Sequence, residues 1–178
     1  MEESEKKRWV RELFLQYEGR LLRYVMKFTT HEKASEIVQE SFVKLLKVED
    51  PSTLTGKELA WLFRVSRNRA LDRLKKEKPM SLLKPGEDIP FESESPEEKM
   101  ERDQEKSKAA EILQSLTPTQ KEVVRLKFQE DMSYKEIAEV TGHSVSHVGV
   151  ILHEAIKKLR AQANMDPQKS KVVQNEKR

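Results

Sequence analysis

Basic side chains gather in one short stretch of the chain, where their chemistry suits phosphate binding. From Trp61 to Lys78 the sequence reads WLFRVSRNRALDRLKKEK, with seven basic and two acidic residues. Lysine and arginine at this density can neutralise nucleic-acid phosphates. Trp61 and Phe63 stand at its start, where exposed rings could stack on unpaired bases. Because aromatic residues at helical spacing usually pack in a core, we expect Phe63 to be buried and leave both roles open for Trp61.

A second candidate site is SYKEIAEVTGHSVSHVGVILHEAIKKLR, from Ser133 to Arg160. It is typical of a helix-turn-helix, whose second helix enters the major groove of DNA, with a turn at Gly142-His143-Ser144. An inward apolar stripe would consist of Val148, Leu152, Ala155 and Leu159. The outward positions available for contacts are Ser146, His147, Gly149, Val150, His153, Lys157 and Lys158. An ordinary helical hairpin without a ligand fits the pattern equally well.

The sequence contains little that would indicate a metal site or an enzyme active site. His147 and His153 would lie about 240° apart around a helix, and His143 falls in the turn, so the three rings would not converge on one ion. The chain contains no cysteine, which removes thiolate ligands and cysteine nucleophiles. It also lacks a phosphate-binding glycine loop, an HExxH motif and a serine elbow. The sequence therefore predicts no catalytic residue, no metal site and no cofactor.

Helical periodicity predicts the elements that hold the basic stretch. Large side chains recur at steps of three and four over residues 9–28, which indicates one helix or two collinear ones, and again over residues 37–46. The segment EDPSTLTG, with its proline and glycine, predicts a loop. A third helix is expected over residues 57–78, where the next proline closes the region. These helices would form a first domain over residues 1–78.

The middle of the chain has a different composition. Residues 79–95 contain three prolines and one glycine without periodicity, which predicts a linker. Between Gly86 and Glu105 the chain carries nine acidic residues against two basic ones. A solvated tether is the favoured interpretation of this acidic run, and mimicry of nucleic acid is the alternative.

Capping sequences indicate a second domain over residues 96–163. Ser95, Thr117 and Ser133 are each followed by glutamate or glutamine at the third helical position. In this arrangement the two side chains bind the unpaired amides of a helix start. Residues 164–178 have no apolar face and are predicted to form a frayed basic tail.

Composition favours an all-α fold of two small helical domains joined by an acidic flexible linker. Charged residues make up 37% and hydrophobic residues 36% of the 178-residue chain, which suits helices with narrow apolar stripes. Strands would need alternating runs between turn residues, and the sequence contains none. It also lacks an apolar run long enough to cross a bilayer and a secretory signal at its start. We therefore expect a cytoplasmic protein.

Three stretches resemble, in the same order, parts of the extracytoplasmic-function sigma factors of bacterial RNA polymerase. ASEIVQESFVKLLK, residues 34–47, is similar to the family's polymerase-clamp helix. ELAWLFRVSRNRALDRLKK, residues 58–76, is similar to its promoter-melting and -10-recognition helix, and residues 116–160 resemble its -35-recognition domain. The resemblance implies region-two-like and region-four-like domains. It also implies a transcription initiation factor that binds core polymerase, recognises promoters and melts the -10 region.

The resemblance implies a partner for each group of residues. Core polymerase would be bound by Glu36, Gln39 and Glu40, while Phe42 would be buried. The -10 element and neighbouring phosphates would be contacted by Trp61, Arg64, Arg67, Asn68, Arg69, Asp72, Arg73, Lys75 and Lys76. The loop from Asp50 to Gly56 would receive a base flipped out of the stack. The -35 element would be contacted by Ser144, Ser146, His147, Gly149, Val150, His153, Lys157, Lys158 and Arg160.

The second helix of the predicted helix-turn-helix departs from the family pattern. Family members commonly carry basic residues where this sequence has Gly149, Ile151 and Glu154. Attraction to the DNA backbone should be weaker there, because each missing cation is one lost phosphate contact. Glycine would permit a close approach to DNA or protein, and Val150 could contact a thymine methyl group.

The implied partners are core polymerase and promoter DNA, bound by a chain that is monomeric when free. Signal sensing in this family often resides in a separate anti-sigma factor, so such a partner is compatible with the resemblance. The main alternative is a two-domain helix-turn-helix regulator that binds paired half-sites as a dimer. A protein adaptor that copies a sigma domain is a more distant alternative.

Overall fold

Helices make up the regular structure of the part of the chain that the computed structural model describes, residues 3–77 and 115–164. The helices are α1 (Glu3–Val25), α2 (His31–Leu46), the 3-10 helix η1 (Pro51–Leu54), α3 (Glu58–Glu77), α5 (Pro118–Phe128), α6 (Tyr134–Thr141) and α7 (Val145–Asn164). These two segments contain no strand, which confirms the all-α class there. The predicted linker at 79–95, the predicted cap at Ser95 and the tail beyond Asn164 lie outside the described residues.

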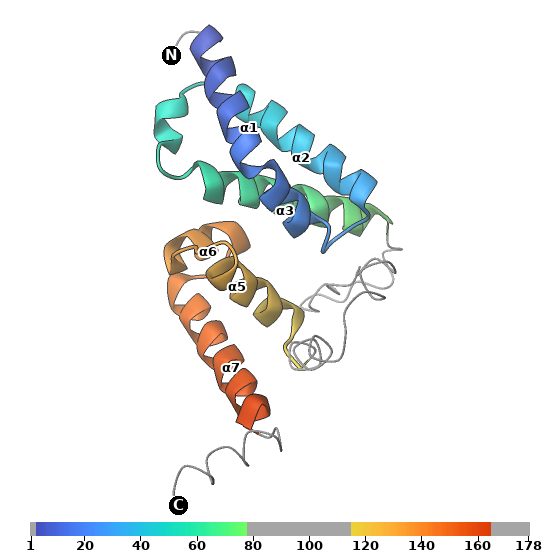
Figure 1. Ribbon diagram of the computed structural model, residues 1–178, viewed down its shortest axis with the longest axis vertical. Helices are drawn as coiled ribbons and strands as arrows, with labels where there is room; N and C mark the ends of the chain where they lie inside the picture. Colours follow the sequence, from blue (N-terminus) through green and yellow to red (C-terminus); the bar gives the residue numbers. More distant parts are fainter. Residues whose placement is uncertain (1–2, 78–114, 165–178) are drawn as a thin grey trace, which may run out of the picture.

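The first three α-helices pack around a common core (Figure 1). α1 and α2 lie side by side, and α3 crosses both of them. Their periodic apolar positions point inward, so that Leu21, Ile37, Leu45 and Phe63 are completely buried. The burial of Phe63 confirms the core role expected from the sequence. α1 runs as one helix, which settles the choice between one helix and two.

A pair of buried serines brings α2 and α3 close together. Ser66 donates its hydroxyl to Ser41 Oγ at 2.9 Å, and Ser41 donates its own to the carbonyl of Ile37 at 2.8 Å. Both hydroxyl groups are therefore hydrogen-bonded although both residues are buried. Small side chains at these positions let the helices approach without leaving an unsatisfied polar group.

The segment predicted as a loop before α3 contains the short helix η1. The carboxylate of Asp50 accepts the backbone N–H of Ser52 at 3.0 Å and its hydroxyl at 2.6 Å. These bonds to Ser52 lower the pKa of Asp50. Gly56 follows with a φ of 73°, a left-handed conformation that favours glycine. The sequence predicted a loop here, and the structure adds a capped 3-10 turn inside it.

Local capping defines the helices of the second segment. Thr117 and Ser133 each form a complete capping box, as their sequence patterns predict. α6 ends at Gly142, whose φ of 80° provides a left-handed helix end. The hydroxyl of Ser144 then accepts the N–H of His147 at 3.1 Å at the start of α7. The predicted helix, turn and helix from Ser133 onward are therefore confirmed.

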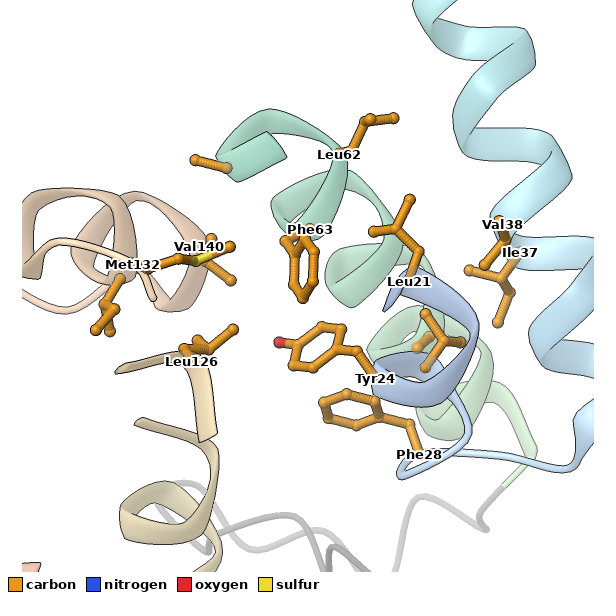
Figure 2. Packing of buried hydrophobic residues seen from close by; sticks show 14 of the residues in the cluster. Leu21, Tyr24, Phe28, Ile37, Val38, Leu62, Phe63, Leu126, Met132 and Val140 are labelled. Atoms are coloured by element: carbon orange, nitrogen blue, oxygen red, sulfur yellow. The ribbon is translucent and has the colours of Figure 1, made fainter. Parts of the chain in front are cut away.

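The two groups of helices share one cluster of buried residues. α6 packs against α3, whereas α7 extends away from the first three α-helices (Figure 1). In Figure 2, Tyr24 from the first group points toward Leu126 from the second, Val140 and Met132 lie on that same side, and the ring of Phe63 stands against Tyr24. The halves are therefore held against each other by apolar packing. Within the described residues, no helix has the combination of length and apolar character that crossing a membrane demands.

Candidate nucleic-acid interface

The basic stretch forms α3, and part of it makes a stripe along one side of that helix. Trp61, Arg64, Asn68, Asp72 and Lys75 follow one another at steps of three or four, so they share one side of the helix. The last four are exposed, whereas the indole of Trp61 is partly buried and packs against the core cluster. The stripe presents two cations, Arg64 and Lys75, and the amide of Asn68 to a nucleic-acid strand, with the carboxylate of Asp72 among them.

Two further arginines of α3 are paired with acids of α2. Arg69 Nε lies 2.6 Å from Glu40 Oε2, and Arg73 Nη2 lies 2.8 Å from Glu40 Oε1. Arg73 Nη1 lies 2.7 Å from Glu36 Oε2. These pairs are weak because solvent screens their exposed carboxylates. Residues predicted to bind polymerase and residues predicted to bind -10 DNA are therefore in direct contact with each other.

The Glu40 carboxyl is expected to titrate below the usual range of a glutamate. The hydrogen bond from Arg69 outweighs partial burial and, with the charge of Arg73, lowers the pKa of Glu40. Since the folded-state pKa is depressed, this stabilisation is complete above the unfolded-state pKa of about 4.3. It is lost as the pH falls through the folded-state value. A carbon-13 NMR titration should therefore place the Glu40 midpoint below about 4.3.

The matched variant for this titration is Arg69→Gln. It removes the principal hydrogen-bond donor of Glu40 and should move the midpoint upward. Lys57→Gln, an exposed change before the first turn of α3, removes the same charge without touching Glu40 and should leave the midpoint in place. A Glu40 midpoint that is the same in both variants would mean that the Arg69 pair is absent in solution.

Arg67 is turned toward the second group of helices. Its Nε and Nη2 atoms donate to the two carboxylate oxygens of Glu122 on α5, at 2.7 and 3.0 Å. Tyr24 donates its hydroxyl to the same carboxylate at 2.6 Å. Burial, and then the charge of Glu122, raise the pKa of Tyr24 well above its ordinary value. The sequence groups Arg67 with the -10 contacts, but in this conformation only 17% of its side chain is exposed.

The outer side of α2 carries the residues predicted to bind polymerase. Glu36, Gln39 and Glu40 line a shallow hollow together with Val43. Val43 is half exposed, which adds an apolar surface to the acidic one. Phe42, by contrast, is buried in the core, as the sequence predicts. The hollow offers carboxylates, an amide and a methyl-bearing surface to a cationic partner.

The outer side of α7 carries the residues predicted to read -35 DNA. Val148, Leu152 and Ala155 are buried, which confirms three positions of the inward stripe, and Leu159 is partly buried. The exposed predicted contacts are Ser144, Ser146, His147, Val150, His153, Lys157, Lys158 and Arg160. Ser144 also caps α7, so its oxygen already accepts one hydrogen bond. The structure thus places Ser144 directly before α7 and gathers the other seven residues on the accessible side of that helix.

Gly149 and Ile151, two of the α7 positions that lack the basic residue common in the family, differ in their surroundings. Ile151 is buried, so its side chain belongs to the core and offers no contact to DNA. Gly149 is partly covered, and a Cβ atom built on it would stand 3.7 Å from the ring of Tyr134. That separation is an ordinary van der Waals contact, so the fold itself leaves room for alanine at this position.

Further along α7, an acidic and a basic side chain share one hydrogen-bonding partner on α5. The side-chain amide of Gln120 on α5 donates to Glu154 at 3.5 Å and accepts from Lys158 at 3.1 Å. Lys157 and Arg160 extend from neighbouring exposed positions. The cationic end of α7 is therefore anchored to α5 through one lysine while its neighbours face solvent.

Several residues that shape these surfaces were not among those predicted from the sequence. Glu122 and Tyr24 surround Arg67, yet they lie 55 and 43 positions away from it in the chain. No local spacing rule connects residues so far apart. Tyr134 and Val145, both exposed, add apolar surface beside the predicted -35 contacts. The signal for these two was available, because each begins a helix of the helix-turn-helix.

Family models match both halves of the chain. Residues 13–79 match the Sigma-70 region 2 family, and residues 112–161 match the Sigma-70, region 4 family. The two matches lie in the order expected from the sequence. They include α3 and the paired helices α6 and α7, the elements that carry the exposed stripes.

Individual relatives support the same assignment. The RNA polymerase sigma factor SigV of Bacillus subtilis is 31% identical over 135 residues, which are 74% of this chain and 76% of SigV. The ECF RNA polymerase sigma factor BldN of Streptomyces coelicolor is 25% identical over 151 residues, which are 83% of this chain and 57% of BldN.

A solved structure supports the fold. It shows the sigma factor RpoE in complex with the anti-sigma factor NepR from Bartonella quintana. The match has a TM-score of 0.58 and 18% identity, and it covers 88% of this chain and 97% of RpoE. Together with the family models and the sequence relatives, this likeness leads to one conclusion: the chain belongs to the extracytoplasmic-function sigma factors of RNA polymerase.

Proposed function

We propose that this chain is an alternative sigma factor that binds core RNA polymerase and directs it to promoters. In this proposal α2 binds core polymerase through Glu36, Gln39 and Glu40. α3 contacts and melts the -10 element, and α7 reads the -35 element. The observation that carries the proposal is the arrangement of these surfaces, because one chain presents an acidic hollow, a basic helix stripe and an exposed helix-turn-helix face.

The proposed domain boundaries follow the same division. Residues 1–78 would be the region-two domain, residues 79–95 the linker and residues 96–163 the region-four domain. The tail would be residues 164–178. The family matches at 13–79 and 112–161 support the first and third of these ranges.

The proposed partners are core polymerase, promoter DNA and an anti-sigma factor. The relative RpoE was solved with an anti-sigma factor bound, which supports the last of these. The factor would act in the cytoplasm as a monomer, without a cofactor and without catalysing a reaction of its own. Holding melted DNA by phosphate contacts and base stacking requires no covalent step.

Promoter opening tests this proposal directly. The purified chain is combined with sigma-free bacterial core polymerase and promoter DNA that the assembled holoenzyme has selected from a randomised library. A fluorescent base within the -10 region reports strand opening. Opening should require both the chain and core polymerase. Binding of duplex DNA by a dimer of the chain alone, without opening, would instead establish the helix-turn-helix regulator.

Substitutions on α7 should change the preference for the -35 sequence. His147→Ala removes a donor and acceptor from an exposed position, and Val150→Lys replaces an apolar surface by a cation. A lost or altered base contact is worth about 1–3 kcal/mol, so discrimination at one position should change about five- to 150-fold. Competition between promoters with single -35 changes measures this effect. Glu139→Ala, an exposed change on α6, should leave the preference unaltered, and an equally unaltered preference in both α7 variants would exclude the assignment.

A further inference from the structure

We propose that α7 reads its -35 element through the methyl group of a thymine, with Val150 as the apolar contact, and not through the edge of a guanine. The inference rests on the proposed function and deepens it, since it names the chemistry of the DNA that α7 recognises. The DNA would carry a thymine in the major groove where it faces Val150.

Val150 lies at the centre of the outer side of α7. On a helix with about 3.6 residues per turn, the positions three and four residues away share one side with it. Those four neighbours are exposed and polar, and they are Ser146, His147, His153 and Glu154. Val150 itself is 52% exposed, while α7 meets the core from its opposite side. One apolar side chain is therefore presented to solvent in the middle of a polar surface.

The cations of α7 lie too far along the helix to read the same bases. Guanine is commonly read by an arginine or lysine that binds its O6 and N7 atoms together. Residues 145–156 contain neither, and Lys157 comes seven residues after Val150, about 10 Å further along the helix axis. In a helix-turn-helix the N-terminal residues of the second helix contact the base edges. The later cations are therefore placed to bind phosphates.

The apolar surface continues beside Val150. Gly149 has no side chain, and a Cβ atom built on it would stand 3.7 Å from the ring of Tyr134. Tyr134 is exposed, as is Val145, four residues before Gly149. In the major groove of DNA, thymine is the base that presents a methyl group, and an apolar side chain recognises it by contact. Placing that methyl group against Val150 removes apolar surface of both partners from water, which is favourable.

DNA is favoured over a protein as the occupant of this surface. The exposed valine belongs to the second helix of a helix-turn-helix, within the residues that match the Sigma-70, region 4 family. Its exposed neighbours Ser146 and His147 carry groups that donate and accept hydrogen bonds, as base edges require. The apolar contact is thus continuous with the proposed -35 surface.

The test removes the methyl group without changing the base pairing, because uracil pairs with adenine as thymine does and lacks only that methyl group. The assembled holoenzyme first selects promoter duplexes from a library randomised in the -35 element. Each thymine of the selected element, on either strand, is then replaced in turn by uracil, and competition binding measures each affinity. The full-length variant is Val150→Ser. The matched control is Leu15→Ser on α1, which also removes an exposed apolar side chain.

Uracil at one position should weaken binding by the parent protein and by the control about fourfold, the change that corresponds to one buried methyl group. In Val150→Ser the thymine and uracil duplexes should bind about equally. Equal affinities in the parent protein at every position, a selected element without thymine on either strand, or an unchanged ratio in Val150→Ser would each overturn the methyl contact. A Val150→Ser protein that keeps the ratio but binds core polymerase more weakly would make Val150 a protein contact.

Promoter opening by the parent protein separates this inference from the proposed function. Core-dependent opening without any uracil effect overturns the methyl contact and leaves the sigma-factor assignment intact. Failure to open promoters overturns that assignment. The full-length chain alone then selects the duplexes, and the same uracil series decides the methyl contact. If neither the holoenzyme nor the chain alone selects a duplex, both conclusions fall.

Discussion

Exchange of Glu36 and Glu40 for lysine is expected to weaken binding of core RNA polymerase at least about a hundredfold. The two carboxylates lie on the outer side of α2, beside the exposed Gln39, where a cationic partner can reach them. Reversing both charges replaces attraction by repulsion, and like charges brought together across an interface cost several kcal/mol. Few other changes on the surface should have so large an effect on this interaction.

The measurement is fluorescence anisotropy of the labelled chain titrated with core polymerase. DNA is left out, because the same substitutions remove the partners of Arg69 and Arg73 and would also alter DNA binding. The matched control carries Glu12→Lys and Glu18→Lys, two exposed positions on α1. Undiminished polymerase binding by the α2 variant, with circular dichroism showing an intact fold, would place the polymerase contact elsewhere.

Phe63→Ala is expected to lower the free energy of unfolding by about 3–5 kcal/mol. Phe63 is completely buried and lies against Tyr24 between the two groups of helices. Truncation to alanine loses the transfer free energy of the ring and leaves a cavity that the surrounding helices can fill only in part. Urea denaturation followed by circular dichroism measures the loss.

The control is Phe128→Ala at the end of α5, where 63% of the residue is exposed. Its effect should stay within about 0.5 kcal/mol, as for most surface substitutions. The comparison also tests the stacking role considered for the aromatic residues near the start of α3. A stable Phe63→Ala protein with impaired binding of single-stranded DNA would show that the ring serves nucleic acid instead of the core.

The arginines and lysines of α3 have different neighbours despite their uniform appearance in the sequence. Arg64 and Lys75 extend into solvent, whereas Arg69 and Arg73 bind the acids of α2. Arg67 binds Glu122 across the two halves. α3 is therefore both a candidate DNA surface and the helix whose arginines form ion pairs with α2 and α5. The effect of substituting one of its basic residues depends on which acid that residue binds.

The helices and their caps follow from local patterns in the sequence. The inward positions of α2 and α7 follow a spacing of three and four, because a helix turns once in about 3.6 residues. The capping boxes at Thr117 and Ser133 join residues only three positions apart. Gly142 ends α6 for a similarly local reason, since its positive φ suits a residue without a side chain. Patterns confined to one or two turns can be read directly from the chain.

The use of the helix surfaces depends on contacts between residues that are far apart in the chain. The sequence grouped Arg67 with the -10 contacts, but its position opposite Glu122 depends on residues 55 positions apart meeting in space. Arg20 and Glu130 are 110 positions apart. Charge occurs on several sides of α3, so periodicity alone does not reveal which side meets α2, α5 or solvent. That choice is made by the packing of apolar side chains from both halves into one cluster, because this packing fixes the rotation of each helix about its own axis.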